Sequence, residues 1–305
     1  MIPTLFVVSI VAFLIVYLIP GGPASAMLGM EADPAEVAAL NTSLGFDRSF
    51  IEQYVSWIGG VLTGDWGQSY FLNMSVLDAI NQYFWPTLSI AIFALIIALI
   101  LSIPLGILAA YKRGTAVDYI TVSISLIGVA IPSFLLSIAL MVLLAVNIRL
   151  FPAAGYASIA EGIGEHLRYI ALPSISLGIV QAAYLVRITR SEMLEVLNDQ
   201  MIRTARAKGL SEFKVIARYA LKNAMPVILT AIGQSFGTLV TGTIVTETIF
   251  SIPGIGMLTM SSISKRDVYV IQGVVLFMTL VYIVVNLVVD LLYGVVDPRI
   301  QPDKE

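Results

Sequence analysis

The chain of 305 residues contains no cysteine and only one histidine, His166. The missing cysteine excludes disulfides, thiolate metal sites and cysteine nucleophiles. A single histidine argues against a histidine-based metal centre or proton relay. We therefore expect this chain to bind no metal.

Charged residues are also scarce. They make up 12% of the chain, whereas hydrophobic residues make up 58%. A soluble domain carries about 25% charged residues, so this balance predicts a protein of the lipid bilayer. The chain also has no phosphate-binding loop of the form Gly-x-x-x-x-Gly-Lys-Ser/Thr, and even the dipeptide Gly-Lys is absent. We therefore expect no ATP site and no bound cofactor in this chain.

Long apolar segments indicate the membrane helices. A helix needs roughly 20 mostly apolar residues to cross the bilayer. The first segment lacks the charged flank of a signal peptide, so we expect a retained helix. The sequence predicts an all-α polytopic membrane protein with six transmembrane helices, at residues 2–19, 86–111, 119–146, 169–186, 226–246 and 271–296.

The second to fifth of these segments contain no Asp, Glu, Lys, Arg or His. Ionisable groups inside a bilayer usually mark proton or ion pathways. A proton- or sodium-coupled carrier is therefore disfavoured.

Lysine and arginine are divided unequally between the loops on the two sides. Twelve of the 17 fall in one set of loops and five in the other. Because cytoplasmic loops are enriched in these residues, both termini are predicted to be cytoplasmic. The predicted layout is a single membrane domain, residues 1–305, with a first helix (1–19), an extracytoplasmic loop with short helices (20–85), a five-helix core (86–296), a cytoplasmic loop (187–224) and a cytoplasmic tail (297–305).

Two short helices are expected in the extracytoplasmic loop. Asp33 followed by Pro34 is typical of a helix start, and Asp47 is the expected start of the second helix. Phe50 and Trp57 would lie on one face of that helix.

The segment "TARAKGLSEFKVIARYALKNA", residues 204–224, is strongly basic although apolar segments lie on both sides. Helix-favouring residues run from Ser191 to Lys208, and Gly209 is the expected left-handed cap. Ser211 is expected to cap a second helix, with Glu212 in its first turn. The loop therefore predicts a helix–turn–helix.

Three interpretations compete for this basic loop. The charge could satisfy the positive-inside rule and contact anionic lipid, but this does not explain the turn chemistry. A DNA-binding helix–turn–helix is disfavoured, because membrane helices tether both ends of the segment. The third interpretation is a docking element for a cytosolic partner, with apolar anchors and orienting charges.

The fifth predicted helix carries a polar stripe. Gln234, Thr238, Thr241 and Gly242 lie on one face at 100° per residue. The stripe could line a wet path, or it could be tight helix packing joined by hydroxyls. The pattern alone leaves both open.

The cytoplasmic loop resembles the coupling loop of binding-protein-dependent ABC transporter permeases of the dipeptide/oligopeptide/nickel subclass. The similarity lies in "RTARAKGLSEFKVIARYALKNAMPV", residues 203–227, and extends to "LTGDWGQS", "TETIFSIPGIG" and "NLVVDLLYGVVDPRI". The broader permease signature has Glu-Ala-Ala where this chain has Arg203-Thr204-Ala205; only Ala205 and Gly209 are kept. Met257 stands where the family more often has a polar or charged residue, a difference that bears on substrate.

The resemblance implies a type I ABC importer permease fold in a prokaryotic inner membrane and a non-catalytic subunit. The implied partners are a second, usually non-identical permease, one or two cytosolic ATPases that bind ATP and Mg²⁺, and an extracytoplasmic substrate-binding protein. Peptides are the implied substrates, and no nucleic acid is expected as a partner.

The resemblance also implies roles for individual residues, with the helix after Gly209 as the coupling helix. The residues expected to couple to the ATPase are Arg203, Ala205, Arg206, Lys208, Gly209, Leu210, Ser211, Phe213, Lys214 and Ile216. Among them, Ala205 and Gly209 would allow close backbone approach and Leu210, Phe213 and Ile216 would be apolar anchors. The residues expected on the substrate path are Gln234, Thr238, Thr241, Gly242 and Glu247.

Two other functions remain open from the sequence. A passive or partner-gated channel for small solutes would also lack ion coupling and a nucleotide site. A membrane scaffold could use the basic loop to recruit a cytosolic protein without transport.

Overall fold

The computed structural model describes residues 2–14, 24–25, 28, 32–43, 45, 47–69 and 71–296. The predicted end of the first helix at residue 19 and the predicted tail, residues 297–305, lie outside the described residues.

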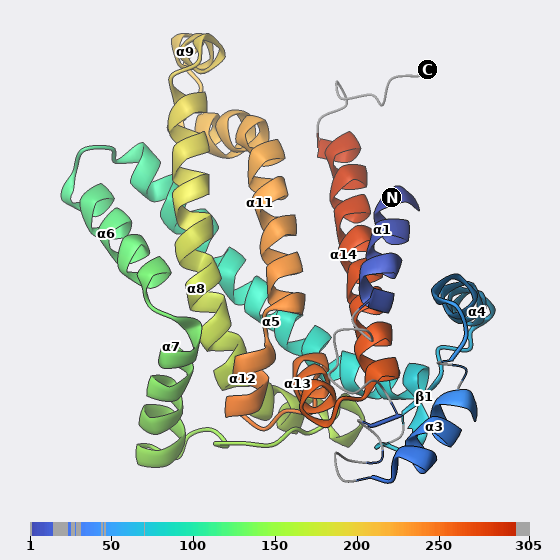
Figure 1. Cartoon of the computed structure of the whole chain (residues 1–305). Helices are drawn as coiled ribbons and strands as arrows, with labels where there is room; N and C mark the ends of the chain where they lie inside the picture. Colours follow the sequence, from blue (N-terminus) through green and yellow to red (C-terminus); the bar gives the residue numbers. More distant parts are fainter. Residues whose placement is uncertain are drawn as a thin grey trace, which may run out of the picture. The chain divides into compact units, whose positions relative to one another are not determined.

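The described part of the chain is almost entirely helical (Figure 1). The one antiparallel pair of strands within these residues, two residues each, places Gln68 opposite Ser75. The elements in chain order are α1 (Ile2–Leu14), α3 (Pro34–Ser43), α4 (Phe50–Thr63), β1 (Gln68–Ser69), β2 (Met74–Ser75), α5 (Val76–Tyr111), α6 (Ala116–Ala130), α7 (Ser133–Leu140), the π-helix η2 (Met141–Asn147), the 3₁₀ turn η3 (Ile159–Glu161), α8 (Ile163–Leu197), α9 (Gln200–Ala207), α10 (Glu212–Lys214), the π-helix η4 (Val215–Ala220), α11 (Leu221–Thr241), α12 (Ile244–Ile249), α13 (Ile255–Lys265) and α14 (Val268–Val296).

Four or five membrane spans lie within the described residues. α5, α8, the run Glu212–Thr241 and the part Val268–Leu292 of α14 are each long and apolar enough to cross a bilayer. The pair α6 and α7–η2 passes the same test only together, and it is bent by 97°. The chain is therefore an all-α polytopic membrane protein.

The third predicted span, residues 119–146, is wrong as a single helix. α6 ends at Ala130, and Ile131 is extended with φ −77° and ψ 122°. Pro132 follows, and proline disfavours helical geometry in the residue before it and has no N–H to donate. The bend of 97° between the two pieces follows this break.

The chain divides into two compact units, and α5 and α14 each contribute to both. Unit 1 comprises the described residues up to Thr87 together with 253–283, and unit 2 comprises 88–252 with the described residues from 284 onward. The core of unit 1 is an apolar cluster of Val76, Ala79, Ile80, Ile255, Leu258, Val270 and Val274.

The two short helices of unit 1 follow the predicted cap chemistry in one case and not in the other. Asp33 Oδ1 accepts the N–H of Ala35 at 2.9 Å, directly before Pro34 at the helix start. The second helix begins at Phe50 with Ser49 as its cap and Glu52 completing the capping box, so the predicted cap at Asp47 is wrong. A serine with glutamate three residues later satisfies two backbone N–H groups instead of one.

In unit 2, α8 is closely packed by its neighbours through small residues. A Cβ on Gly178 would lie 2.9 Å from the carbonyl oxygen of Ala94, and a Cβ on Gly128 would lie 2.7 Å from Ala183 Cβ. Backbones therefore approach as closely as in small-residue contacts between membrane helices.

An ion pair joins the start of α6 to α8. Arg190 Nε and Nη2 donate to the two carboxylate oxygens of Asp118 at 2.6 and 2.9 Å. The backbone N–H of Gly114 donates to the same carboxylate at 3.0 Å. The Asp118 side chain is 4% exposed and that of Arg190 is 25% exposed. Because the geometry is bidentate and shielded, this pair resists screening better than a surface pair.

We predict that Asp118→Ala lowers the free energy of unfolding by about 3 kcal/mol, because it leaves the Arg190 guanidinium without its partner in a mostly buried site. Changing both residues to apolar ones of similar volume should recover most of that loss. Thermal unfolding in detergent measures both. Arg187→Ala, on the same helix but exposed, is the matched control and should change the value by less than about 0.5 kcal/mol. A double variant as unstable as Asp118→Ala alone would contradict this account.

Candidate functional site

The predicted helix from Ser191 to Lys208 is in fact two helices. α8 ends at Leu197, and α9 begins after Asp199, whose side chain accepts the N–H of Met201 at 3.0 Å. Asp199 is extended with φ −64° and ψ 149°. An aspartate in this geometry is a preferred N-cap, so it starts a new helix here. Figure 1 shows α9 at the end of α8, turned away from its axis.

The turn after α9 is built on Gly209. Its φ is +76°, and a Cβ at this position would meet nothing within 4 Å. Its N–H donates to the carbonyl of Arg206 at 2.9 Å, and Leu210 N–H reaches that of Ala205 at 3.4 Å. The predicted left-handed glycine is confirmed, and its requirement is backbone conformation, not space.

Ser211 occupies the N-cap position of the next helix with extended backbone, as predicted, but its side chain makes no capping hydrogen bond. The turn is instead closed by an ion pair. Arg206 Nε and Nη2 donate to the two carboxylate oxygens of Glu212 at 2.8 and 3.2 Å. The two side chains are 40% and 43% exposed, so the pair contributes little to stability.

The helix after Gly209, which the resemblance implied to be a separate coupling helix, is the beginning of a membrane span. α10, η4 and α11 continue from Glu212 to Thr241 as one 30-residue candidate span. The separate short element is therefore α9, which has eight residues. We call α9 with the turn through Phe213, residues 200–213, the coupling element, after the role that we propose for it below.

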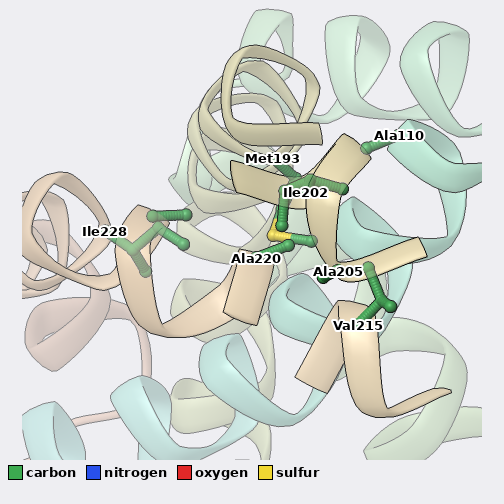
Figure 2. Close-up of a cluster of buried hydrophobic side chains, with 8 residues drawn as sticks. Ala110, Met193, Ile202, Ala205, Val215, Ala220 and Ile228 are labelled. Atoms are coloured by element: carbon green, nitrogen blue, oxygen red, sulfur yellow. The ribbon is translucent and has the colours of Figure 1, made fainter. Parts of the chain in front are cut away.

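A buried apolar cluster lies beneath the coupling element (Figure 2). Met193 of α8, Ile202 of α9 and Ala220 of η4 point toward one another. Leu210 and Ile216 are partly buried against the same cluster. The coupling element is thus packed onto the ends of the two spans that it connects. The complete cluster is Ala110, Met193, Ile202, Ala205, Val215, Ala220, Ala224 and Ile228.

The predicted coupling residues therefore divide into inward and outward sets. Ala205 is 6% exposed and, like Leu210 and Ile216, packs within the chain. Phe213 is 82% exposed. The remaining predicted cations on the exposed side are Arg203, Lys208 and Lys214.

The polar stripe of the fifth predicted helix lies on α11 and its C-cap residue, Gly242, because this helix ends at Thr241 and not at the predicted residue 246. Gln234, Thr238, Thr241 and Gly242 are all exposed in unit 2, whereas the intervening Ser235 and Leu239 are buried. Tyr184 of α8 donates to Gln234 Oε1 at 3.4 Å. The stripe is therefore not an internal packing seam of this unit. The sequence did not indicate Tyr184, because its contact joins residues 50 positions apart on two different helices.

Glu247 lies apart from this stripe. Its side chain is 0% exposed, and Oε1 accepts from the Thr243 hydroxyl at 2.6 Å. Its carbonyl accepts the N–H of Ile252 at 2.8 Å. Glu247 thus stabilises the turn that follows α12.

Two family models match this chain. Residues 102–302 match the binding-protein-dependent transport system inner membrane component. Residues 1–91 match the N-terminal part of the same kind of membrane component. The chain belongs to this family. It is therefore a membrane component of a transport system, and the comparison places it in the inner membrane.

Relatives match this permease over nearly its whole length. The dipeptide transport system permease protein DppB of Escherichia coli (strain K12) is 40% identical over 327 aligned positions, covering 99% of this chain and 96% of the relative. A protein of Brucella abortus (strain 2308) assigned to a peptide transport system as its permease is 38% identical over 302 residues, with 99% and 96% coverage.

A solved structure shares the fold. An inward-facing MetNI methionine ABC transporter chain superposes with a TM-score of 0.61 at 18% identity, covering 72% of this permease and 97% of that chain. At this identity the likeness bears on fold alone, and it supports an ABC importer permease architecture.

We predict that Gly209→Ala lowers the free energy of unfolding by about 1–2 kcal/mol, because a Cβ disfavours positive φ. The matched control is Gly164→Ala in α8, where a Cβ also meets nothing within 4 Å but the backbone is helical; this change should be neutral or stabilising by up to about 1 kcal/mol. Thermal unfolding of both variants decides. Equal effects at the two positions would show that the conformation of Gly209 is unimportant.

Proposed function

We propose that this chain is the membrane-spanning permease subunit of an ATP-driven, binding-protein-dependent importer of di- or oligopeptides. The observation that carries the proposal is the full-length similarity to a dipeptide permease, at 40% identity and 99% coverage of this chain. The coupling element is a short helix packed onto two spans, and such an element could transmit movement from the ATPases to the spans.

The proposed assembly has three kinds of partner. A second homologous permease would complete the translocation path, and one or two cytosolic ATPases would bind ATP and Mg²⁺. An extracytoplasmic binding protein would deliver the peptide. Six transmembrane helices with both termini in the cytoplasm would put the coupling element on the ATPase side, which its lysines and arginines favour.

The docking surface for the ATPase is the outward face of the coupling element. Leu210 and Ile216 pack inward and hold the element in place. Phe213, 82% exposed, is the apolar anchor that is left for a partner, because large aromatic side chains dominate interface energetics. Arg203 and Lys208 are also exposed, and their charge would orient the encounter.

The apolar cluster transmits movement from this surface. Ile202 on α9, Met193 on α8 and Val215 on η4 are all 0% exposed. Close-packed interiors have low compressibility, so a displacement of α9 is passed to both spans instead of being absorbed. ATP-driven closure of the ATPases would in this way move α8 and α11.

The stripe on α11 is the proposed substrate path. Gln234 and Tyr184 present an amide and a phenol beside exposed Thr238. Such neutral donors and acceptors suit the peptide backbone, whose N–H and C=O groups need hydrogen bonds wherever they leave water. Glu247 contributes by fixing the turn at the end of this path, not by meeting substrate.

The competing function is a passive or partner-gated channel. Reconstitution of the two permeases with the ATPases and the binding protein distinguishes this channel from the ATP-driven importer. The proposal expects dipeptide uptake into proteoliposomes that stops when ATP is withheld or when the ATPase Walker A lysine is replaced. Uptake that is unchanged without ATP would establish the channel instead.

We predict that Phe213→Ala lowers ATP-dependent uptake by about tenfold or more, because it removes the apolar anchor of the dock. Its effect on the free energy of unfolding should stay below about 0.5 kcal/mol, since the ring contacts solvent. Leu210→Ala is the matched control and should cost about 1–2 kcal/mol of stability through lost packing. Uptake and thermal unfolding are measured on both variants. If the Phe213→Ala variant takes up peptide at the wild-type rate, Phe213 is not part of the docking surface.

A further inference from the structure

Unit 1 contains a small cavity beside α13 that the proposed coupling and path do not use. Its volume is about 110 Å³. This space holds a few waters or one end of a small organic molecule, not a whole dipeptide. The side chains that matter at its wall are Phe71, Tyr83, Met257, Lys265 and Asp267.

Asp267 is held rigidly in the break between α13 and α14. Arg266 before it adopts left-handed geometry, with φ 58° and ψ 35°. The Asp267 N–H donates to the carbonyl of Ser262 at 2.8 Å, and its own carbonyl accepts from Ile271 N–H at 3.0 Å. Both backbone groups are thus satisfied, which fixes where the side chain begins.

One oxygen of the Asp267 carboxylate accepts a hydrogen bond within the chain. Oδ2 accepts from the Ser69 hydroxyl at 2.5 Å. That hydroxyl oxygen accepts the N–H of Leu72 at 3.0 Å, so its single hydrogen is directed to Asp267. This contact joins the end of β1 to the residue before α14.

The other carboxylate oxygen, Oδ1, accepts no hydrogen bond within the described residues. Asp267 is 3% exposed, lines the cavity, and its Oδ1 is buried without a hydrogen-bond partner. Buried carboxylate oxygens are normally paired or hydrogen-bonded. The contact with Ser69 explains the orientation of the side chain but leaves this acceptor for a ligand.

We propose that Asp267 Oδ1 and this cavity bind a primary ammonium group, and specifically the free amino terminus of a peptide in transit. The identity of the ligand as peptide rests on the proposed function. A negative acceptor selects a cation, and the aromatic walls of Phe71 and Tyr83 favour an organic ammonium through cation–π attraction. A calcium ion would need six or more oxygen ligands, which this mostly apolar wall does not offer.

One ring of this wall already faces an ammonium group of the chain itself. Lys265 Nζ lies 5.9 Å from the centroid of the Phe71 ring. Lys265 is exposed, and it does not form one of the ion pairs found within 4.0 Å among the described residues. The Phe71 ring is therefore placed to contact an ammonium group. Lys265 does not pair with Asp267, whose Oδ1 has no hydrogen-bond partner.

The test measures binding to the assembled transporter without ATP, by thermal unfolding in nanodiscs with glycinamide, diglycine or N-acetyl-diglycine. The proposal expects both free amines to raise the unfolding temperature and the acetylated peptide to leave it unchanged. Asp267→Asn, which keeps the shape and the Ser69 contact, should weaken glycinamide binding by about tenfold or more. Ser69→Ala, which removes the contact but keeps the charge, is the matched control and should retain binding.

Three results would overturn the proposal. Equal stabilisation by N-acetyl-diglycine would show that the amino group is not recognised. Unchanged glycinamide binding by Asp267→Asn would place the site elsewhere. Stability that depends on phosphatidylethanolamine in the nanodisc, with no response to either free amine, would assign the same ammonium chemistry to a lipid headgroup. Because glycinamide is not a peptide and no ATP is present, these results are independent of whether wild-type uptake of dipeptides succeeds.

Discussion

The apolar contact between Ile202 of α9, Met193 of α8 and Val215 of η4 is the interaction on which the coupling element depends. An isolated helix as short as α9 is not stable in water, since helices need about 12–15 residues even in favourable sequences. Full burial of Ile202 supplies about 1.5–3 kcal/mol, and Ala205 on the same face adds to it. Asp199 and Gly209 then define where α9 begins and ends. Without this apolar cluster, the loop would connect the two spans without packing against them. With the cluster, the loop packs against the ends of both spans.

This packing also divides the chemistry of the loop between two faces. The inward face is apolar and belongs to the chain's own core, while the outward face carries Phe213 and the cations. The ion pair of Arg206 with Glu212 spans the turn between the two helices. A partner that presses on the outward face therefore acts on α8 and α11 together. The exposed stripe of α11 lies in the same span, Glu212–Thr241, as Phe213, so the proposed dock and the proposed path share one continuous helical run.

Several local features could be predicted from single residues. Gly209 between two amphipathic segments indicates a left-handed turn, and Asp33 before Pro34 indicates a helix start, because each depends only on its own backbone. The spans could be located because their composition alone separates them from the loops. Family membership could also be predicted, since residues 203–227 carry a distinctive motif.

Features that depend on distant partners could not be predicted. The Asp118–Arg190 pair joins residues 72 positions apart, and neither has a sequence neighbour that indicates the other. The break at Asp199 lies within helix-favouring residues, so composition predicts one helix where a capping side chain makes two. The expected apolar anchors Leu210 and Ile216 indicate burial, but the same residues fit burial against a partner or against the chain's own spans. Only the structure distinguishes these.

The central claim is that the outward face of the coupling element docks onto an ATP-hydrolysing partner. The absence of native cysteine allows a single photoreactive maleimide to be placed at will. We would label an Ala207→Cys variant, exposed on α9, in native membranes, irradiate it, and identify the cross-linked protein by mass spectrometry. A Gly164→Cys variant, exposed at the other end of α8, would serve as the control. We predict a cross-link from position 207 to a subunit that contains a Walker A motif, and none from position 164. An intact complex with no such cross-link from position 207 would contradict the claim.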